Sequence, residues 1–366
     1  MPTPPQPCLE LLTCLAQDRL GQARALVEDP AFDVDALERF CARNQVGGYI
    51  HLRLEEAGLA PRHPVMERLQ ERRRRQEKSC ERNRARLAEV AAAFAAARCD
   101  VVLHKGLYLA ERFYGAPHLR TSWDLDLLVR HRDRERARDV LLAAGFERSS
   151  PVLLGETLSS RFAHGFDYMR GAFKVDLHWA LSGHPAIRFD YDRMLDEAPL
   201  TEVVGVEVRV LSDDALLAAL LVSAFEDLQR GGLRLRTFVD LQQVLARLEA
   251  ATDWEAFFAR RRAEGVEAIC AAVLHVFAAV FSTSELFPAL DAALDARPRS
   301  RPDAALQEAL LSAAAPGLRG RIRAWSLYDA GLPSVFAWWC VSLPFRVVVH
   351  RKPRTRAKKT AIASAC

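Results

Sequence analysis

The sequence contains three pairs of aspartates in which one residue separates the two carboxylates. These pairs are Asp33/Asp35, Asp124/Asp126 and Asp190/Asp192. Two carboxylates at this spacing can bind a divalent cation when they lie on one face of a β-strand. The first and third pairs lie in polar segments before helix-like stretches, where short carboxylates commonly cap helices. The middle pair is therefore the candidate for chemistry.

The middle pair lies in the segment TSWDLDLLVR, residues 121–130, whose alternation predicts a strand. Trp123, Leu125 and alternate apolar residues after them would point to one side, with Asp124 and Asp126 on the other. The two carboxylates would then lie roughly 6 to 7 Å apart at the backbone. Burying both without a cation would be costly, so we expect a metal and a further ligand.

Asp176 is the candidate for the further ligand. It lies in the segment AFKVDLHWA, residues 172–180, which also alternates and predicts a strand. Lys174 and His178 share the face of Asp176, and an adjacent strand would bring that face beside Asp124 and Asp126. We interpret His178 as a packing residue or a support for Asp176 rather than as a ligand.

A phosphate site is predicted at Lys105 and Gly106. Gly106 lies between the strand-like DVVLHK, residues 100–105, and a helix-like segment. A glycine there lets an anion approach the backbone N–H groups at the helix start, and Lys105 adds a positive charge. Three carboxylates, divalent cations and a phosphate site are typical of phosphoryl or nucleotidyl transfer by a two-metal mechanism.

Other polar and aromatic residues allow less specific interpretations. Arg120 could contact phosphate or pair with Asp124 or Asp126, and both interpretations stay open. Trp123 and Trp179 are expected as core anchors. Arg236 and Asp240, four residues apart on a predicted helix, could approach a nucleotide across a cleft, but a surface ion pair is the favoured interpretation.

The elements that must position these residues form an α+β chain. Residues 7–97 show helical signals, including an arginine-rich stretch at 72–75 whose interleaved glutamates favour a solvated helix face. Strand and helix patterns alternate between 99 and 211, with hairpins expected at Gly171 and Gly205. We predict an N-terminal helical region (1–98), a mixed-sheet core (99–211) and a C-terminal helical region with a basic tail (212–366).

Composition excludes several classes of protein. The 366 residues are 50% hydrophobic and 27% charged, which is typical of a globular protein. A net charge of +4 does not favour a nucleic-acid-binding protein, although the Arg72–Arg86 stretch and basic tail keep that hypothesis as a third choice. The eight scattered cysteines show no zinc-ligand spacing, so we expect reduced thiols.

The two ends of the sequence bear on location. The first residues, MPTPPQPCLELL, lack the pattern of a secretory signal, and we expect a cytoplasmic protein. Residues 332–349 are apolar and precede the basic run RKPRTRAKK, so a weak membrane-surface contact by 332–359 stays open. A buried C-terminal element with a basic tail is the favoured interpretation.

Three stretches together carry a resemblance to a known family. They are LHKGLYLAERFYGAPHLRTSWDLDLLV (103–129), AAGF (143–146) and VDLHW (175–179). They resemble the uncharacterised bacterial nucleotidyltransferase-like family within the DNA polymerase β-type nucleotidyltransferase superfamily. The motifs cover about residues 98–180, and the helical flanks fit the same family.

The resemblance implies a nucleotidyltransferase fold and roles for individual residues. Asp124 and Asp126 would bind both metal ions, and Asp176 would bind the ion that activates the attacking hydroxyl. Gly106 and Ser122 would lie near the triphosphate. The superfamily's usual Gly-Gly or Gly-Ser is replaced here by Lys-Gly at a longer spacing, so Lys105 would complete the phosphate site.

The implied reaction is transfer of a nucleotide monophosphate from an NTP such as ATP to an acceptor hydroxyl or phosphate. The implied cofactor is Mg²⁺ or Mn²⁺. The acceptor, whether a small molecule, peptide or protein, is not identified by the sequence. The alternative hypothesis is a catalytically weak member that acts as an accessory or antitoxin-like binding protein.

Overall fold

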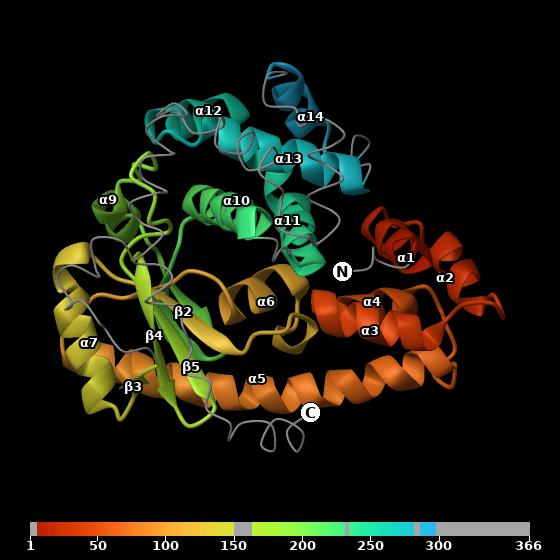
Figure 1. The fold of residues 1–366 in the computed structure, drawn as a ribbon, viewed down its shortest axis with the longest axis horizontal. Helices are drawn as coiled ribbons and strands as arrows, with labels where there is room; N and C mark the ends of the chain where they lie inside the picture. Colours follow the sequence, from red (N-terminus) through yellow and green to blue (C-terminus); the bar gives the residue numbers. More distant parts are fainter. Residues whose placement is uncertain (1–5, 150–162, 231–233, 282–285, 298–366) are drawn as a thin grey trace.

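The computed structural model describes residues 6–149, 163–230, 234–281 and 286–297. These residues form one mixed seven-stranded sheet with helices around it (Figure 1). The α+β fold class predicted from the sequence is confirmed. The positions outside these ranges include the whole 332–359 segment for which a membrane contact stays open.

The N-terminal region is helical, as predicted. Its helices are α1 (Gln6–Ala16), α2 (Leu20–Glu28), α3 (Val34–Asn44), α4 (Gly47–Glu56) and α5 (Pro64–Ala96). The 33-residue α5 runs along one side of the molecule, from α7 beside the sheet to the α3–α4 pair (Figure 1). Its arginines pair with glutamates four positions away, Arg73 with Glu77 and Arg75 with Glu71. These pairs confirm the prediction of a solvated helix face.

Seven strands form the sheet. They are β1 (Val102–Leu103), β2 (Asp124–Leu128), β3 (Glu147–Arg148), β4 (Gly165–Arg170), β5 (Phe173–His178), β6 (Leu200–Val203) and β7 (Val206–Val210), in the order β3-β4-β5-β2-β1-β7-β6. Strands β2 and β5 are parallel, as are β1 and β7, and the other pairs are antiparallel. The two predicted hairpins are present, and their turns place Gly171 and Gly205 at positive φ.

Among the described residues, three helices connect the strands and five follow them. The connecting helices are α6 (Leu107–Tyr114), α7 (Arg134–Ala143) and α9 (Tyr191–Asp196). The C-terminal ones are α10 (Asp213–Arg230), α11 (Leu235–Leu248), α12 (Trp254–Ala263), α13 (Glu267–Phe281) and α14 (Pro288–Asp295). Figure 1 shows α10 to α14 on the side opposite α5. Short 3-10 turns lie at 117–119, 131–133 and 249–251.

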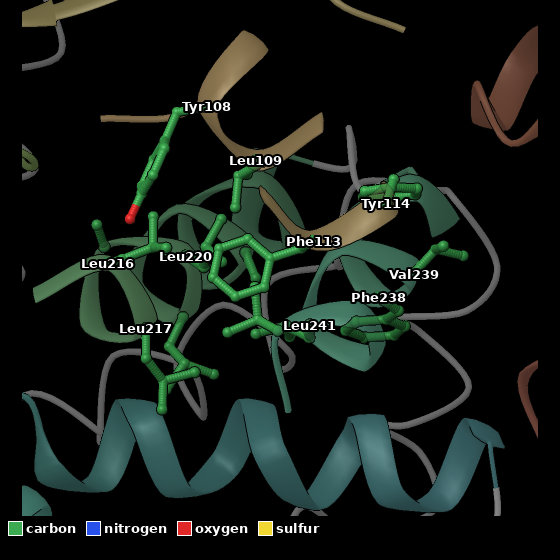
Figure 2. Close-up of a cluster of buried hydrophobic side chains, with 14 of the residues drawn as sticks. Tyr108, Leu109, Phe113, Tyr114, Leu216, Leu217, Leu220, Phe238, Val239 and Leu241 are labelled. Atoms are coloured by element: carbon green, nitrogen blue, oxygen red, sulfur yellow. The ribbon is translucent and has the colours of Figure 1, made fainter. Parts of the chain in front are cut away.

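Helix α6 packs against α10 and α11. In Figure 2 its Phe113 lies among leucines of α10, close to α11, and Leu217, Phe238 and Leu241 belong to the same cluster. These four side chains are at most 2% exposed. Burying a side chain of this size stabilises the fold by roughly 1.5 to 3 kcal/mol. The contact therefore holds α6, which begins after Gly106, against the C-terminal helices.

The buried apolar side chains of all three predicted regions form one continuous cluster. The element types change close to the predicted boundaries, because α5 ends at Ala96 and α10 begins at Asp213. The division into three domains stays a prediction. Within the described ranges, no helix is long and apolar enough to cross a membrane.

Two sequence interpretations outside the sheet are confirmed. Asp33 and Asp190 are N-caps, and their carboxylates accept hydrogen bonds from Ala36 N at 2.8 Å and Arg193 N at 3.0 Å. The described cysteines are free thiols: Cys8, Cys14, Cys41, Cys80, Cys99 and Cys270.

Candidate functional site

Strands β2 and β5 bring the three predicted carboxylates together. In their parallel register, Asp126 pairs with Asp176 and Asp124 pairs with Lys174. Paired residues on neighbouring strands lie about 4.8 Å apart, and their side chains share one face of the sheet. The carboxylate cluster, defined here as Asp124, Asp126 and Asp176, therefore lies on one face, while Leu125 and Val175 are buried on the other. The three carboxylates predicted from strand alternation are therefore neighbours in space.

Two lysines neutralise part of this charge. Lys174 Nζ lies 2.6 Å from Asp176 Oδ2 and 3.4 Å from Asp167 Oδ2 on β4. Lys105 Nζ lies 3.4 Å from Asp126 Oδ1. Both ammonium groups are partly exposed, so each can move when another cation approaches.

The three carboxyl groups have different acidities because their surroundings differ. Burial and the neighbouring Asp126 charge raise the pKa of Asp124. Burial, followed by the charges of Asp126 and Asp167, raises the pKa of Asp176 to about 8 against the opposing effect of Lys174. Burial alone would also raise the pKa of Asp126, but Lys105 and the His178 ring hold it well below its usual range. Mutual repulsion of this kind is relieved when a divalent cation binds.

One oxygen of the carboxylate cluster has no hydrogen-bond partner. Asp176 Oδ1 is buried and unpartnered, although Oδ2 of the same group is held by Lys174. A buried carboxylate oxygen without a donor is costly. It is also the kind of oxygen that Mg²⁺ or Mn²⁺ binds, so the residues present fit a divalent metal ion.

The predicted phosphate-site residues lie beside the cluster. Gly106 has φ +71° and ψ −120°, a conformation that favours glycine, and it immediately precedes α6. A Cβ at Gly106 would lie 3.1 Å from Ser122 Oγ, and this hydroxyl donates a 3.1 Å hydrogen bond to the carbonyl of Asp124. Gly106, Ser122 and Lys105 therefore surround the start of β2.

Arg120 pairs with a carboxylate that the sequence analysis did not assign to it. Its guanidinium donates to both oxygens of Asp240 on α11, at 2.7 and 2.8 Å, and to the carbonyl of Gly106 at 3.3 Å. Tyr114 OH donates to Asp240 Oδ1 at 2.6 Å. Arg120 and Asp240 are both buried, and Asp240 helps raise the pKa of Arg120. Arg120 thus links the Gly106 turn to α11 instead of pairing with Asp124 or Asp126.

The expected surface ion pair between Arg236 and Asp240 is wrong. Asp240 is 2% exposed and is occupied by Arg120 and Tyr114. Arg236 instead donates to Gln45 Oε1 and to the carbonyl of Thr121, the latter at 3.0 Å. The i to i+4 spacing on one helix could not reveal a partner 120 residues away.

Arg236 lies near the carboxylate cluster, although the partners of its side chain were not predicted from the sequence. Its buried Nε has no hydrogen-bond partner, and its charge lowers the pKa of Asp124. Burial, followed by the neighbouring Arg120 charge, lowers the pKa of Arg236 itself. The structure therefore holds an incompletely paired cation near the carboxylate cluster, where an anionic ligand would stabilise it.

Two histidines also lie at Asp126. One ligand atom from each of His104, Asp126 and His178 lies within 4.8 Å of the others. His178 Nε2 is 3.7 Å from Asp126 Oδ1, which is too long for a hydrogen bond. His178 was predicted to be a packing residue or a support for Asp176, and His104 was not predicted as a site residue. The only signal for His104 was its position next to Lys105 in the strand-like DVVLHK segment.

Of the two tryptophans expected in the core, only Trp179 is buried. It is 4% exposed, and its Nε1 donates to the carbonyl of Ala163 at 3.1 Å. Trp123 is 57% exposed, so its predicted role is wrong. The reason is that β2 begins at Asp124, and the alternation of buried residues does not extend to Trp123.

A cavity of about 480 Å³ lies elsewhere, between α5, α6 and the β6–β7 hairpin. Its lining includes Glu77, Glu81, Glu111 and Glu202 but none of the residues of the carboxylate cluster. We locate the candidate site by the chemistry of its side chains and not by this volume.

The sequence and the fold were both compared with those of known proteins. The solution structure of the antibiotic-resistance factor ANT(2″)-Ia is similar with 17% identity and a TM-score of 0.36, over 50% of this chain and 93% of that one. No curated protein matches the sequence. The family model described as "Uncharacterised nucleotidyltransferase" matches residues 30–282, which is more than half of the chain and includes the whole carboxylate cluster. The chain therefore belongs to this family of uncharacterised nucleotidyltransferases.

Proposed function

We propose that the protein is a metal-dependent nucleotidyltransferase that moves a nucleotide monophosphate from an NTP to an acceptor hydroxyl or phosphate. The observation that carries the proposal is the register of β2 and β5, which pairs Asp126 with Asp176 and leaves Asp176 Oδ1 unpartnered. Membership of the nucleotidyltransferase family supports the same reaction class.

In this proposal Asp124, Asp126 and Asp176 hold Mg²⁺ or Mn²⁺. When bound, the ions would neutralise the triphosphate and increase the acidity of the acceptor hydroxyl. The carboxylates supply the negative charge that binds the ions and set where the acceptor must lie relative to the α-phosphate. Lys174 maintains neutrality at Asp176 in the metal-free protein.

The triphosphate would bind at the start of β2 and α6. Gly106 leaves the backbone accessible there, Ser122 offers a hydroxyl, and Lys105 supplies a mobile positive charge. Arg236 adds a second cation whose Nε has no partner in the described structure. Arg120 acts as a positioning residue, because its bonds to Asp240 and to the Gly106 carbonyl hold the turn in place.

The proposal is tested by incubating the protein with each α-labelled NTP, with Mg²⁺ or Mn²⁺, and with cell extract. We expect label to enter an acceptor with the wild type and not with Asp124→Asn. Asp190→Asn is the matched control, since asparagine also caps helices and Asp190 lies in another Asp-x-Asp pair. Absence of label with every NTP and both metals would contradict the proposal and favour the accessory-protein alternative.

A further inference from the structure

His104 is a buried histidine that the proposed reaction does not use. It is 3% exposed, and neither ring nitrogen has a hydrogen-bond partner. An imidazole buried in this way loses its hydration without compensation, at a cost of roughly 1 to 3 kcal/mol. An imidazole nitrogen without a hydrogen-bond partner is available to bind a metal, and imidazole is a common metal ligand in proteins.

His178 presents its ring to the same carboxylate. It lies opposite Gly165 in the β4–β5 register, and a Cβ at Gly165 would be 2.7 Å from His178 Nδ1. The absence of a side chain at Gly165 therefore makes room for the ring, while Nε2 faces Asp126 and has no hydrogen-bond partner. The His164 ring stacks on the other side at 5.7 Å between centroids. Packing thus holds His178 in one orientation.

We propose that His104, Asp126 and His178 form a transition-metal site that is distinct from the carboxylate cluster in ligand chemistry. Two imidazoles and one carboxylate suit zinc-like divalent ions, whereas Mg²⁺ prefers oxygen ligands. Ligands around a tetrahedral zinc ion lie about 3.4 Å apart, because each is about 2.0 to 2.1 Å from the metal. The present spacing, within 4.8 Å, needs only a small inward movement of the side chains.

In the metal-free protein, Lys105 lies beside Asp126, one of the three proposed ligands. Its ammonium lies 3.4 Å from Asp126 Oδ1, the same oxygen that faces His178. The Lys105 side chain is 28% exposed and can turn toward water when the metal binds. The ion and the ammonium therefore compete for one oxygen, and removing the lysine charge should tighten metal binding.

The test is calorimetric titration of the chelator-treated full-length protein with Zn²⁺ alone. His178→Phe and His104→Phe should each weaken Zn²⁺ binding at least tenfold, whereas Lys105→Met should strengthen it. His118→Phe is the matched control, since its side chain is 22% exposed against 17% for His178, and it should bind as the wild type does. An increase in Zn²⁺ affinity in Lys105→Met cannot arise from misfolding. The proposal therefore stays testable even if His104→Phe does not fold.

Other results overturn the proposal. Equal Zn²⁺ affinity in the wild type and His178→Phe would exclude His178 as a ligand. A tenfold loss in Asp176→Asn together with no loss in His178→Phe would assign Zn²⁺ to the carboxylate cluster. Visible absorption of the Co²⁺-loaded protein provides a second readout, since it should change in His178→Phe and stay the same in Asp176→Asn. None of these measurements depends on nucleotide transfer, so failure of the proposed function would appear separately, as absence of label with every NTP and both metals.

Discussion

The protein buries carboxylates in two neighbouring places and satisfies them to different degrees. Asp240 accepts two hydrogen bonds from Arg120 and one from Tyr114, so both of its oxygens are bound. Asp176 is held by Lys174 at Oδ2 only, and its Oδ1 has no partner. Since desolvation makes an unpaired buried oxygen costly, the first arrangement suits a structural link and the second suits a ligand site.

The two regions therefore have different roles, one structural and one in ligand binding. The Arg120–Asp240 pair ties the Gly106 turn to α11, and the α6 contacts with α10 and α11 in Figure 2 support that tie. The carboxylate cluster is left with excess negative charge on this rigid frame. Substitutions in the Arg120–Asp240 pair are therefore expected to reduce stability, and substitutions in the carboxylate cluster are expected to reduce activity.

The largest expected effect is on activity at Asp124. Asp124→Asn should reduce nucleotide transfer by at least about 10³-fold, roughly 4 kcal/mol of transition-state stabilisation. The unfolding free energy should stay the same or increase slightly, because a neutral side chain relieves the repulsion that raises the pKa of Asp124. Turnover and urea unfolding measure the two effects. Wild-type turnover in this variant would remove the two-metal assignment.

The next effect concerns stability at Asp240. Asp240→Ala should lower the unfolding free energy by about 3 to 5 kcal/mol, because it leaves the buried Arg120 charge unpaired. Urea unfolding monitored by circular dichroism measures this loss. Asp35→Ala, at an exposed carboxylate, is the control and should change stability by less than about 0.5 kcal/mol. A loss below about 1 kcal/mol at Asp240 would show that the pair is not a structural link.

Metal removal separates nucleotide binding at the carboxylate cluster from binding at arginine surfaces. We expect an NTP to raise the melting temperature with Mg²⁺ or Mn²⁺ present and not with a chelator, because the triphosphate binds as its metal complex. Differential scanning fluorimetry with and without the chelator measures the shift. Equal shifts under both conditions would point to the arginine-rich face of α5.

A smaller effect is expected from pH in the metal-free protein. The folded-state pKa of Asp176, about 8, lies above its usual value near 3.8, so the folded protein binds the extra proton between these values. The stabilisation that the protonated Asp176 carboxyl gives to the folded state is complete below about pH 4 and is lost as pH rises toward 8. Melting temperatures between pH 4 and 9 should therefore fall less in Asp176→Asn than in the wild type. Identical pH profiles would contradict the raised pKa.

Much of this arrangement could be predicted from local sequence patterns. Alternation identified β2 and β5, and it placed Asp124, Asp126 and Asp176 on the face opposite the apolar residues of their strands. The polar context of Asp33 and Asp190 correctly predicted caps. These features depend on neighbours within a few residues, which is the range that sequence patterns describe.

The features that were missed depend on contacts between distant segments. The partner of Arg120 is 120 residues away, and Arg236 of α11 donates to the Thr121 carbonyl across 115 residues. His104 escaped notice because β1 contains only two residues and shows no alternation. Trp123 was misassigned because the strand pattern was extended one residue beyond the start of β2. Such long-range contacts are set by tertiary packing and have no local signal.

The most direct test of the carboxylate cluster is Asp176→Ala, measured by nucleotide dissociation constant and by turnover. Asp176 is the ligand proposed to align the acceptor, so the metal–NTP dissociation constant should be nearly unchanged while turnover falls about 10²-fold, roughly 2.7 kcal/mol. Asp167→Ala is the matched control, because Asp167 pairs with Asp176 across β4 and β5 and also contacts Lys174. Normal turnover in Asp176→Ala, or an equal loss in Asp167→Ala, would contradict the proposed three-carboxylate site.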